Sequence, residues 1–440
     1  MDLRPFHALR YDDRRVRLSQ VVAPPYDVID EAHRDALYAR DPHNVIRLIL
    51  NRDADRYGSA AAHLSAWVDA GVLRQDDTPA LWLYGQTFHY GNTEFVRTGI
   101  IGTVRLEPFS SGHIRPHERT LSGPKEDRMR LIEACQTNLS PIFGLYADQR
   151  RVLDEARQLA ERGAPAMDVT DEFAVRHRVW RISNSPQLDT ITRTLGAQTI
   201  FIADGHHRYE TALAYRDRLH GRGGLMPDDP ANFIMMYLCS MDDPGLLVLP
   251  THRLLRGVAL RSEEFLAALS RNFHVNEFPR SAAGQDRLLA ALATNGSRGH
   301  FGVALADATA LYEITPRSAA AIDQIAPELP PEVRHIDVTL LDRLILRGML
   351  GLDPDAAARA GQLRYCHDTR ETFDAVDARI DQVAFLLGPP DLAQVEAVCR
   401  SGETMPQKST YFYPKLLTGL VFHTLMREVQ VSVVEDARSA

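Results

Sequence analysis

A short apolar segment that turns directly into an amphipathic helix is the feature that most constrains the fold of this chain. Residues 199–202 (Thr-Ile-Phe-Ile) predict a buried strand, and residues 209–219 carry apolar side chains at helical positions 209, 212, 213 and 219. Only the polar stretch that begins with Asp204-Gly205 lies between them, and this is a tight-turn signal. A strand, a tight turn and a helix in this order indicate a mixed α and β fold.

The rest of the chain alternates strand and helix patterns in the same way. Residues 81–90 and 94–106 alternate apolar and polar side chains around a Gly91-Asn92 turn, which predicts an antiparallel hairpin. Further helices are predicted at 31–39, 57–70, 149–162, 188–195, 262–271 and 391–400, and further strands at 246–250, 301–306 and 383–387. The predicted fold class is therefore α/β with α+β mixed sheets, in three regions: 1–148, 149–260 and 261–440.

Composition excludes several classes of protein. The 440 residues are 45% hydrophobic and 25% charged, with a formal net charge of -8, so we expect a globular chain and no general nucleic-acid binding. No stretch approaches the ~18 apolar residues that a membrane span needs. The four cysteines form no C-x-x-C pair, which argues against a disulfide framework and a structural zinc site. We expect a cytoplasmic protein without a membrane partner, and a homodimer is compatible with the sequence.

The segment Asp204-Gly205-His206-His207-Arg208 predicts an anion site. A strand that turns through Asp-Gly into a helix directs backbone N–H groups and the positive end of the helix dipole at one place, and phosphate is the natural ligand. The two histidines and the arginine add donors, Asp204 is expected to cap the helix or to bind a cation, and Thr211 is assigned to the same phosphate site. The alternative is a capped surface helix whose histidines face solvent.

A second polar stretch runs from residue 115 to residue 128 and is expected to be an exposed loop that enters a helix near Glu126. It offers Glu118 or His117 for proton transfer, Lys125 for phosphate and Asp127 for a metal ion, with Thr120 and Arg128 beside them. The alternative is a solvated loop held by salt bridges. A metalloprotease is excluded, because no second histidine follows four positions after His117 and prolines interrupt the segment.

Two more segments carry candidate phosphate ligands. Lys408, Ser409 and Thr410 follow Gly402 in a stretch that nearly spells a P-loop, but Gln407 replaces the second glycine and Gly402 is expected to close a helix. The alternative is a loop packed under the aromatic residues that follow. The fourth candidate is His252-Arg253, which with Thr251 is expected at a strand end, and the sequence taken alone favours the alternative of a surface pair there.

Lysine is rare in this chain. Only three of the fifty basic residues are lysines, and all three fall in these polar motifs: Lys125, Lys408 and Lys415. Because a guanidinium cannot imitate a compact ammonium on phosphate, we interpret Lys125 and Lys408 as phosphate ligands, with chance as the alternative. Lys415, which follows Pro414 in an aromatic stretch, is expected to make a structural contact.

The motifs together resemble the domain of unknown function 1015 family. They are A-P-P-Y-D-V at 23–28, R-P-H-E-x-T with P-K-x-D-R at 115–128, N-x-S-P-I-F at 138–143, D-G-H-H-R-Y-E-T-A at 204–212, T-H-R at 251–253 and M-P-Q-K-S-T-Y-F-Y-P-K at 405–415. The D-G-H-H-R turn is also similar to the phosphate-binding motif of the ParB/sulfiredoxin-like superfamily, which includes free-serine kinases. This likeness implies a ParB/sulfiredoxin-like nucleotide-binding core with N-terminal and C-terminal elaborations.

These observations lead to one hypothesis and two alternatives. The hypothesis is a kinase that uses ATP or ADP with Mg²⁺ and phosphorylates a small hydroxylated metabolite, free serine or a serine-like amino acid. The nucleotide phosphates are assigned to the 204–208 turn, Mg²⁺ to Asp204 or Asp127, and the base to Glu118 or His117. The alternatives are a nucleotide sensor without turnover and a phosphoesterase or nuclease on the same phosphate cradle.

Overall fold

The chain folds into two compact units that do not follow the three predicted regions. The computed structural model describes residues 1–118, 122–147, 152–183, 186–294, 299–318 and 326–426. Unit 1 comprises Met1–Ile114, Leu121–Gly245 and Pro414–Ala440, and unit 2 comprises Arg115–Thr120 and Leu246–Tyr413. The predicted regions 1–148 and 149–260 therefore share one unit for most of their length, because their strands pair in one sheet. Thr120 and residues 149–151 of a predicted helix lie outside the described residues.

A mixed sheet forms the centre of unit 1, and in the described residues it has nine strands in the order β6-β11-β8-β12-β5-β4-β10-β9, with β1 beside β5. β12 runs parallel to β8, and the other pairs for which a register is known are antiparallel. These strands are β1 (Leu3–Arg4), β4 (Leu81–Tyr90), β5 (Thr93–Arg105), β6 (Ile114–Pro116), β8 (Ile142–Tyr146), β9 (Met167–Thr170), β10 (Arg176–Ile182), β11 (Ile200–Asp204) and β12 (Phe233–Ser240). Two small ribbons pair β2 (Leu9–Tyr11) with β3 (Leu73–Gln75) and β7 (Thr137–Asn138) with β21 (His423–Thr424).

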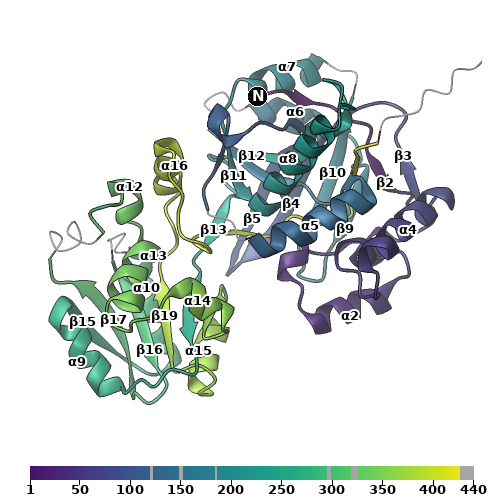
Figure 1. The fold of residues 1–440 in the computed structure, drawn as a ribbon. Helices are drawn as coiled ribbons and strands as arrows, with labels where there is room; N and C mark the ends of the chain where they lie inside the picture. Colours follow the sequence, from purple (N-terminus) through teal and green to yellow (C-terminus); the bar gives the residue numbers. More distant parts are fainter. Residues whose placement is uncertain (119–121, 148–151, 184–185, 295–298, 319–325, 427–440) are drawn as a thin grey trace, which may run out of the picture. The chain divides into compact units, whose positions relative to one another are not determined.

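Helices α5 and α8 lie together on one face of this sheet (Figure 1). Alternate side chains of β11 and β12, among them Ile200, Ile202 and Met236, enter one buried cluster with Ile132 of α5 and Tyr209 of α8. A strand presents every second residue to one face, and a helix presents one stripe, so this packing follows from the period of each pattern. The helices of unit 1 are α1 (Leu18–Val21), α2 (Glu31–Arg40), α3 (Ile46–Ile49), α4 (Arg56–Asp69), α5 (Ser122–Cys135), α6 (Val152–Ala160), α7 (Pro186–Gly196) and α8 (His206–Gly221), with single turns η1 (Tyr26–Val28), η2 (Phe109–Ser111) and η3 (Pro230–Asn232).

Unit 2 is built on an antiparallel sheet of the order β15-β17-β16-β19-β14-β18. Leu288 of α10 and Phe373 of α15 enter its buried cluster together with sheet residues such as Leu386. The strands are β14 (His252–Leu255), β15 (Phe273–Pro279), β16 (Phe301–Leu305), β17 (Ala310–Pro316), β18 (Leu363–Cys366) and β19 (Val383–Leu387), and β13 (Leu247–Leu249) pairs separately with β20 (Tyr411–Tyr413). The helices are α9 (Ser262–Asn272), α10 (Ala282–Thr294), α12 (Pro331–Arg334), α13 (Asp337–Leu340), the π-helix η4 (Leu341–Arg347), α14 (Pro354–Arg359), α15 (Thr369–Asp377) and α16 (Leu392–Ser401).

The mixed α and β class is confirmed, and so are most of the predicted local elements. The 81–106 hairpin forms as β4 and β5, and Gly402 closes α16 with a left-handed φ of 82°. The 115–128 stretch enters a helix as predicted, but the expected exposed loop is wrong for residues 115–117 and for Arg128. Residues 114–116 form β6, α5 already begins at Ser122, and His117 is 1% exposed. Tertiary packing buries His117 and Arg128 because their side chains find partners in distant segments, which the sequence pattern does not show.

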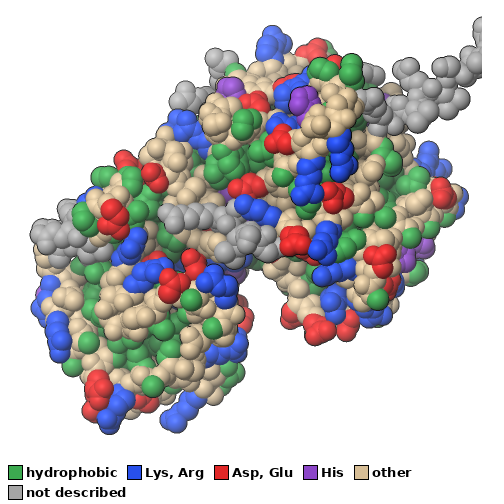
Figure 2. All heavy atoms as spheres, viewed as in Figure 1, with side chains coloured by type: hydrophobic (Ala, Val, Ile, Leu, Met, Phe, Trp, Pro, Cys, Tyr) green, Lys and Arg blue, Asp and Glu red, His purple; other side chains and the backbone are tan. Residues whose placement is uncertain are grey.

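Charge is interspersed on the surface. On the face drawn in Figure 2, acidic and basic side chains alternate over each unit. The four cysteines are buried free thiols, in agreement with the expected absence of a disulfide framework. Among the described helices, none has the length and the apolar character that crossing a membrane requires.

Candidate functional site

The turn between β11 and α8 in unit 1 depends on one glycine. Gly205 is the N-cap of α8 and has φ 91° and ψ 25°, a left-handed conformation that a residue with a side chain rarely adopts. A Cβ at this position would also lie 2.9–3.0 Å from the guanidinium of Arg208. The expectation that Asp204 caps the helix is therefore wrong, because Asp204 still belongs to β11 and Gly205 takes the cap position.

Asp204 lies between two cations. Its Oδ2 is 3.4 Å from the NH2 of Arg208 and 3.6 Å from the Nζ of Lys415. Lys415 thus joins the D-G-H-H-R turn, although the sequence predicted only a structural contact for it. At the start of the helix, His206 is buried and His207 is partly exposed, so the alternative in which both histidines face solvent does not hold for His206.

Arg208 and Thr211 bring two unsatisfied polar atoms to one cavity of unit 1. NH1 of Arg208 donates to the carbonyl oxygen of Pro141 at 2.6 Å, but its Nε is buried without a partner among the described residues. Thr211 is 3% exposed, and its Oγ1 likewise has no hydrogen-bond partner in the described part of the chain. A buried polar atom without a partner is unfavourable by about 1–3 kcal/mol, so these atoms mark a place for a ligand or for water.

The cavity between these side chains is small and carries positive charge. Its volume is about 60 Å³, and the polar residues that line it are Tyr26, Arg128, Thr137, Asn138, Ser140, Arg208 and Thr211. The described lining contains two arginines and no carboxylate. Whole-ligand pockets usually measure about 300–1,000 Å³, so this cavity fits one oxyanion group of a ligand and not a complete nucleotide.

Arg128 is held in place from three sides. Its NH1 and NH2 donate to the carbonyl oxygen of Ile49 at 3.2 and 3.3 Å, and its Nε donates to Asp127 at 2.9 Å. The guanidinium also lies 4.0 Å from the ring centroid of Tyr26, in a cation–π contact. This fixed arginine on the cavity wall comes from the P-K-x-D-R motif, and the tyrosine comes from A-P-P-Y-D-V.

The predicted residues Asp127 and Lys125 already have partners in unit 1. Asp127 accepts a hydrogen bond from the hydroxyl of Tyr57 at 2.8 Å and pairs with Arg128 and, at 3.6 Å, with Arg56. Burial alone would raise the pKa of Asp127, but Arg128 and Tyr57 hold it below its usual range, so the carboxylate is ionised. The Nζ of Lys125 lies 2.6 Å from Oε2 of Glu210, which joins α5 to α8.

A second set of predicted residues meets in unit 2, where Glu118 organises a loop. Its Oε1 accepts hydrogen bonds from the backbone nitrogens of Ser409 at 3.0 Å and Thr410 at 3.3 Å, and its Oε2 accepts one from Lys408 at 3.3 Å. Lys408 has a φ of 57°, which is uncommon outside glycine. The structure therefore unites two motifs that lie some 290 residues apart, and it gives the carboxylate of Glu118 a positioning role.

His117 and Arg253 complete this loop. The Nε2 of His117 lies 2.7 Å from Oγ1 of Thr410, and the NH2 of Arg253 donates to the carbonyl oxygen of Lys408 at 3.0 Å. Burial lowers the pKa of Arg253 to about 10, so this buried side chain stays cationic. Ser409 donates from its hydroxyl to Pro406 and lines a separate cavity of unit 2.

His252 lies inside the sheet of unit 2, at the start of a strand of its own and not at the end of the predicted strand 246–250. It is the first residue of β14, which runs between β19 and β18, and it is 1% exposed. Burial lowers the pKa of His252 to about 4, so it carries no charge at neutral pH. A contribution of this histidine to phosphate binding stays a prediction, and it would require a neutral hydrogen bond.

The two predicted metal ligands do not form a metal site by themselves. Asp127 and Asp204 supply the oxygen ligands that Mg²⁺ prefers, but each already lies beside two cationic groups. Among the described residues, no group of three or more His, Cys, Asp or Glu side chains could hold a metal ion. These donors therefore do not fit a resident Mg²⁺.

Several cavity residues were missed by the reasoning from sequence. Tyr26, Asn138 and Ser140 line the cavity, and each belongs to a motif that the sequence shows. Their polar side chains made them possible ligand contacts, but nothing in the sequence indicates that these separate segments meet at one cavity. Asn138 also accepts a hydrogen bond from the backbone nitrogen of Met235 at 3.1 Å, which ties the 138–143 motif to β12.

Comparison with known proteins gives one family and several solved structures. A family model described as "Protein of unknown function (DUF1015)" matches residues 3–339, and no curated protein matches. A free serine kinase variant in complex with AMP is 11% identical, with a TM-score of 0.34 over 71% of this chain and 87% of that chain. A variant of that kinase with ADP is 12% identical with the same TM-score and coverage, and a conserved hypothetical protein from Pyrococcus furiosus is 13% identical, with a TM-score of 0.34 over 72% of this chain and 92% of that chain.

Proposed function

The chain belongs to the DUF1015 family, and from this premise we propose that it is a phosphotransferase that uses ATP or ADP to phosphorylate a small hydroxylated metabolite. Free serine or a serine-like amino acid is the proposed acceptor. The observation that carries the proposal is the cavity of unit 1, where Arg128, Arg208 and the hydroxyl of Thr211 surround a space for one oxyanion group.

The chemistry of phosphoryl transfer fits such a site. The transferred group needs positioning and neutralisation of its charge more than it needs a covalent partner. The buried guanidinium of Arg128 in α5, and the guanidinium of Arg208 with the orphan hydroxyl of Thr211 in the first turns of α8, meet that need. We assign one phosphate group of the nucleotide to this cavity.

Magnesium enters the proposal as a companion of the nucleotide. The acidic side chains of the predicted metal site are already paired with cations, so a resident ion would have to displace them. A Mg²⁺ ion that arrives on the nucleotide phosphates needs no preformed protein cage, and this is the usual way in which kinases take it.

A second candidate function, a nucleotide sensor without turnover, is favoured by one observation. The carboxylate of Glu118 accepts three backbone hydrogen bonds, and it would lose some of them on taking a proton from a substrate. If Glu118 only positions the 408–410 loop, the base assigned to it is missing, and binding without chemistry would result.

One experiment separates the two functions. The purified full chain is incubated with ATP or ADP, Mg²⁺ and a pool of hydroxylated metabolites that includes serine, and products are identified by mass spectrometry. A new phosphorylated metabolite that Arg208→Ala abolishes supports the kinase. Nucleotide binding by calorimetry without any product supports the sensor, and absence of nucleotide binding in the parent protein rejects both.

A further inference from the structure

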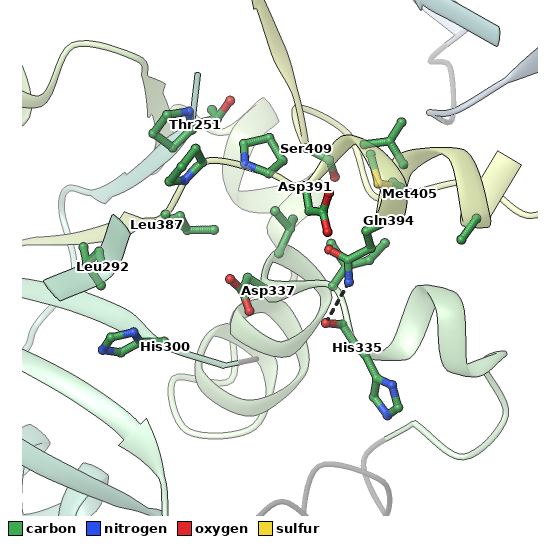
Figure 3. Close-up of a pocket in the computed structure, with 18 of the residues that line it drawn as sticks. Thr251, Leu292, His300, His335, Asp337, Leu387, Asp391, Gln394, Met405 and Ser409 are labelled. Carbon is green, nitrogen blue, oxygen red and sulfur yellow. Dashed lines mark hydrogen bonds between the residues drawn. The ribbon is translucent and has the colours of Figure 1, made fainter. Parts of the chain in front are cut away.

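Unit 2 contains a cavity whose size suits a complete small molecule. Its volume is about 710 Å³, within the range of about 300–1,000 Å³ that is usual for ligand pockets. It lies among the end of β19, the start of α16, the α12–α13 segment and the beginning of β16 (Figure 3). The function proposed above does not depend on this cavity.

His300 lines this cavity and carries an unsatisfied ring nitrogen. Its side chain is 2% exposed, and its Nε2 lies 2.6 Å from Oε1 of Glu313, whose other oxygen accepts a hydrogen bond from Nδ2 of Asn276 at 3.0 Å. In the tautomer whose Nε2–H donates to Glu313, Nδ1 is a hydrogen-bond acceptor. This Nδ1 is buried without a hydrogen-bond partner among the described residues, which calls for a donor on a ligand or on water.

The charged residues on the cavity wall are acidic. Glu332, Asp337 and Asp391 line it, and its described lining contains neither lysine nor arginine. In the view of Figure 3, Asp337 lies between His300 and His335, and Asp391 lies farther up, beside Ser409 and Gln394. Such a wall attracts a cation and repels a phosphate, so the nucleotide of the proposed function does not belong here.

Asp337 is the carboxylate that gains most from a cation. Its Oδ1 accepts one hydrogen bond from the backbone nitrogen of Gly299 at 2.7 Å, and burial raises the pKa of Asp337 to about 6. An ionised carboxylate in this environment is unfavourable, and an opposite charge beside it restores the ionised form. At neutral pH the site is therefore ready for a positively charged ligand.

Apolar side chains form much of the remaining wall, beside uncharged polar residues such as Thr251 and Gln394, and they decide what kind of cation fits. Leu292, Leu387, Pro389, Pro390 and Met405 line the cavity. A metal ion would need several close donors, and the described residues contain no such cluster. An organic cation uses both the carboxylates and the apolar walls.

We propose that the unit 2 cavity binds a small organic ammonium ligand with an apolar body, with Asp337 as its counter-charge and Nδ1 of His300 as a hydrogen-bond acceptor. A free amino acid fits less well, because its carboxylate would face three acidic side chains. The site is thus distinct in its chemistry from the oxyanion cavity of unit 1.

The test uses three probes of the same size and different charge on the full chain. Benzylamine, benzyl alcohol and benzoate are titrated by calorimetry at pH 7.5. We expect benzylamine to bind at least tenfold more tightly than benzyl alcohol, and benzoate not to bind. Equal binding of the three probes, or absence of benzylamine binding, would overturn the proposal.

Variants locate the binding. Asp337→Asn keeps an acceptor for the N–H of Gly299, and it should weaken the binding of benzylamine at least tenfold without changing the affinity for benzyl alcohol. The control is Asp286→Asn, which changes an exposed carboxylate on α10 and should leave both affinities unchanged. Parent-like benzylamine affinity in a folded Asp337→Asn protein contradicts the site. If that variant does not fold, ¹⁵N NMR spectra of the parent protein decide instead, and the His300→Gln variant identifies which ring resonances belong to His300. Benzylamine must then shift the Nδ1 resonance of His300. An unchanged resonance rejects the proposal.

Discussion

Lys415 lies with its Nζ 3.6 Å from Oδ2 of Asp204, although 210 residues separate them in the chain. The same carboxylate oxygen is 3.4 Å from Arg208, so the turn before α8 carries one acid between two cations. Because Lys415 contacts this turn, a Lys415 variant cannot serve as an unaffected control in mutational tests. It also shows that the 405–415 motif contributes a side chain to the anion site predicted at the 204–208 turn.

Arg208→Ala should weaken nucleotide binding by about 1.5–3 kcal/mol, the value of a lost charge-assisted hydrogen bond, and leave the fold intact. Calorimetric titration with ADP and with ATP measures it. The control is Arg218→Ala, which removes an exposed arginine of the same helix that pairs with Glu133. Unchanged affinity in a folded Arg208→Ala protein would remove the turn from the nucleotide site.

Gly205→Ala should lower both stability and nucleotide affinity. Its left-handed φ costs about 1–2 kcal/mol with a side chain present, and the new Cβ meets the guanidinium of Arg208 at about the closest permitted distance. Gly221→Ala, at the other end of α8, has open space and an ordinary φ and should change neither. Thermal melts and ADP titrations measure the stability and the nucleotide affinity of both variants. Equal melting temperatures and equal ADP affinities in the two variants would refute the role of the turn.

Glu118→Gln should reduce turnover by about 10²-fold or more and leave nucleotide affinity nearly unchanged, if Glu118 is the general base. Its role in positioning the 408–410 loop gives another explanation for a loss of rate, because the amide nitrogen of glutamine would face the N–H of one loop residue. The pH–rate profile separates them: loss of a base removes the acidic limb, whereas a displaced loop lowers the rate at every pH. Glu396→Gln, in a helical pair with Arg400, is the matched control, and parent-like turnover in Glu118→Gln excludes both roles.

Replacing any of the three lysines by arginine should impair the protein. Lys125→Arg and Lys408→Arg are still expected to lower activity, because a guanidinium is bulkier and its donors lie in one plane. Lys415, for which the sequence predicts a structural contact, lies beside Asp204, so Lys415→Arg should also weaken nucleotide binding. The control is Arg218→Lys, a charge-conserving change at an exposed ion pair. Full activity in all three lysine variants would show that the three lysines were retained by chance and not because they bind phosphate.

Asp337→Asn should stabilise unit 2 at pH 8. The pKa of Asp337 is raised in the folded state from 3.8 to about 6, so the folded chain binds the proton more tightly, and the associated stability is lost as pH rises from about 4 to 6. Removing the charge should therefore add about 1–3 kcal/mol to the unfolding free energy at pH 8 and nearly nothing below pH 4. The three tryptophans, Trp67, Trp82 and Trp180, all lie in unit 1, so calorimetry is the appropriate measurement. A destabilised variant at pH 8 would contradict the raised pKa.

Local elements could be predicted because their signals are local. The β4–β5 hairpin and α16 with its closing Gly402 depend on side-chain period, turn residues and backbone conformation within about twenty residues. The strand–turn–helix at 200–221 follows the same rule, although Asp204 was expected to cap the helix or to bind a cation and Gly205 takes the cap position.

The position of polar side chains could not be predicted in the same way. His252 looked like the end of a strand and is buried between two neighbouring strands, and His117 looked like part of an exposed loop and is 1% exposed. Whether a polar residue is buried depends on partners from distant segments, such as Thr410 for His117, and no local pattern encodes them.

By itself, the sequence determined the mixed α and β class, the family motifs and the turn before α8, because each depends on residues that are neighbours in the chain. Only the tertiary structure decided that Tyr26, Arg128 and Arg208 surround one cavity, and that Glu118 holds the loop at Ser409. The physical reason is that sites are made by sheet pairing and helix packing, which bring together groups up to some 290 residues apart. Hydrogen bonds and charge pairs then select which of the polar side chains are free to meet a ligand.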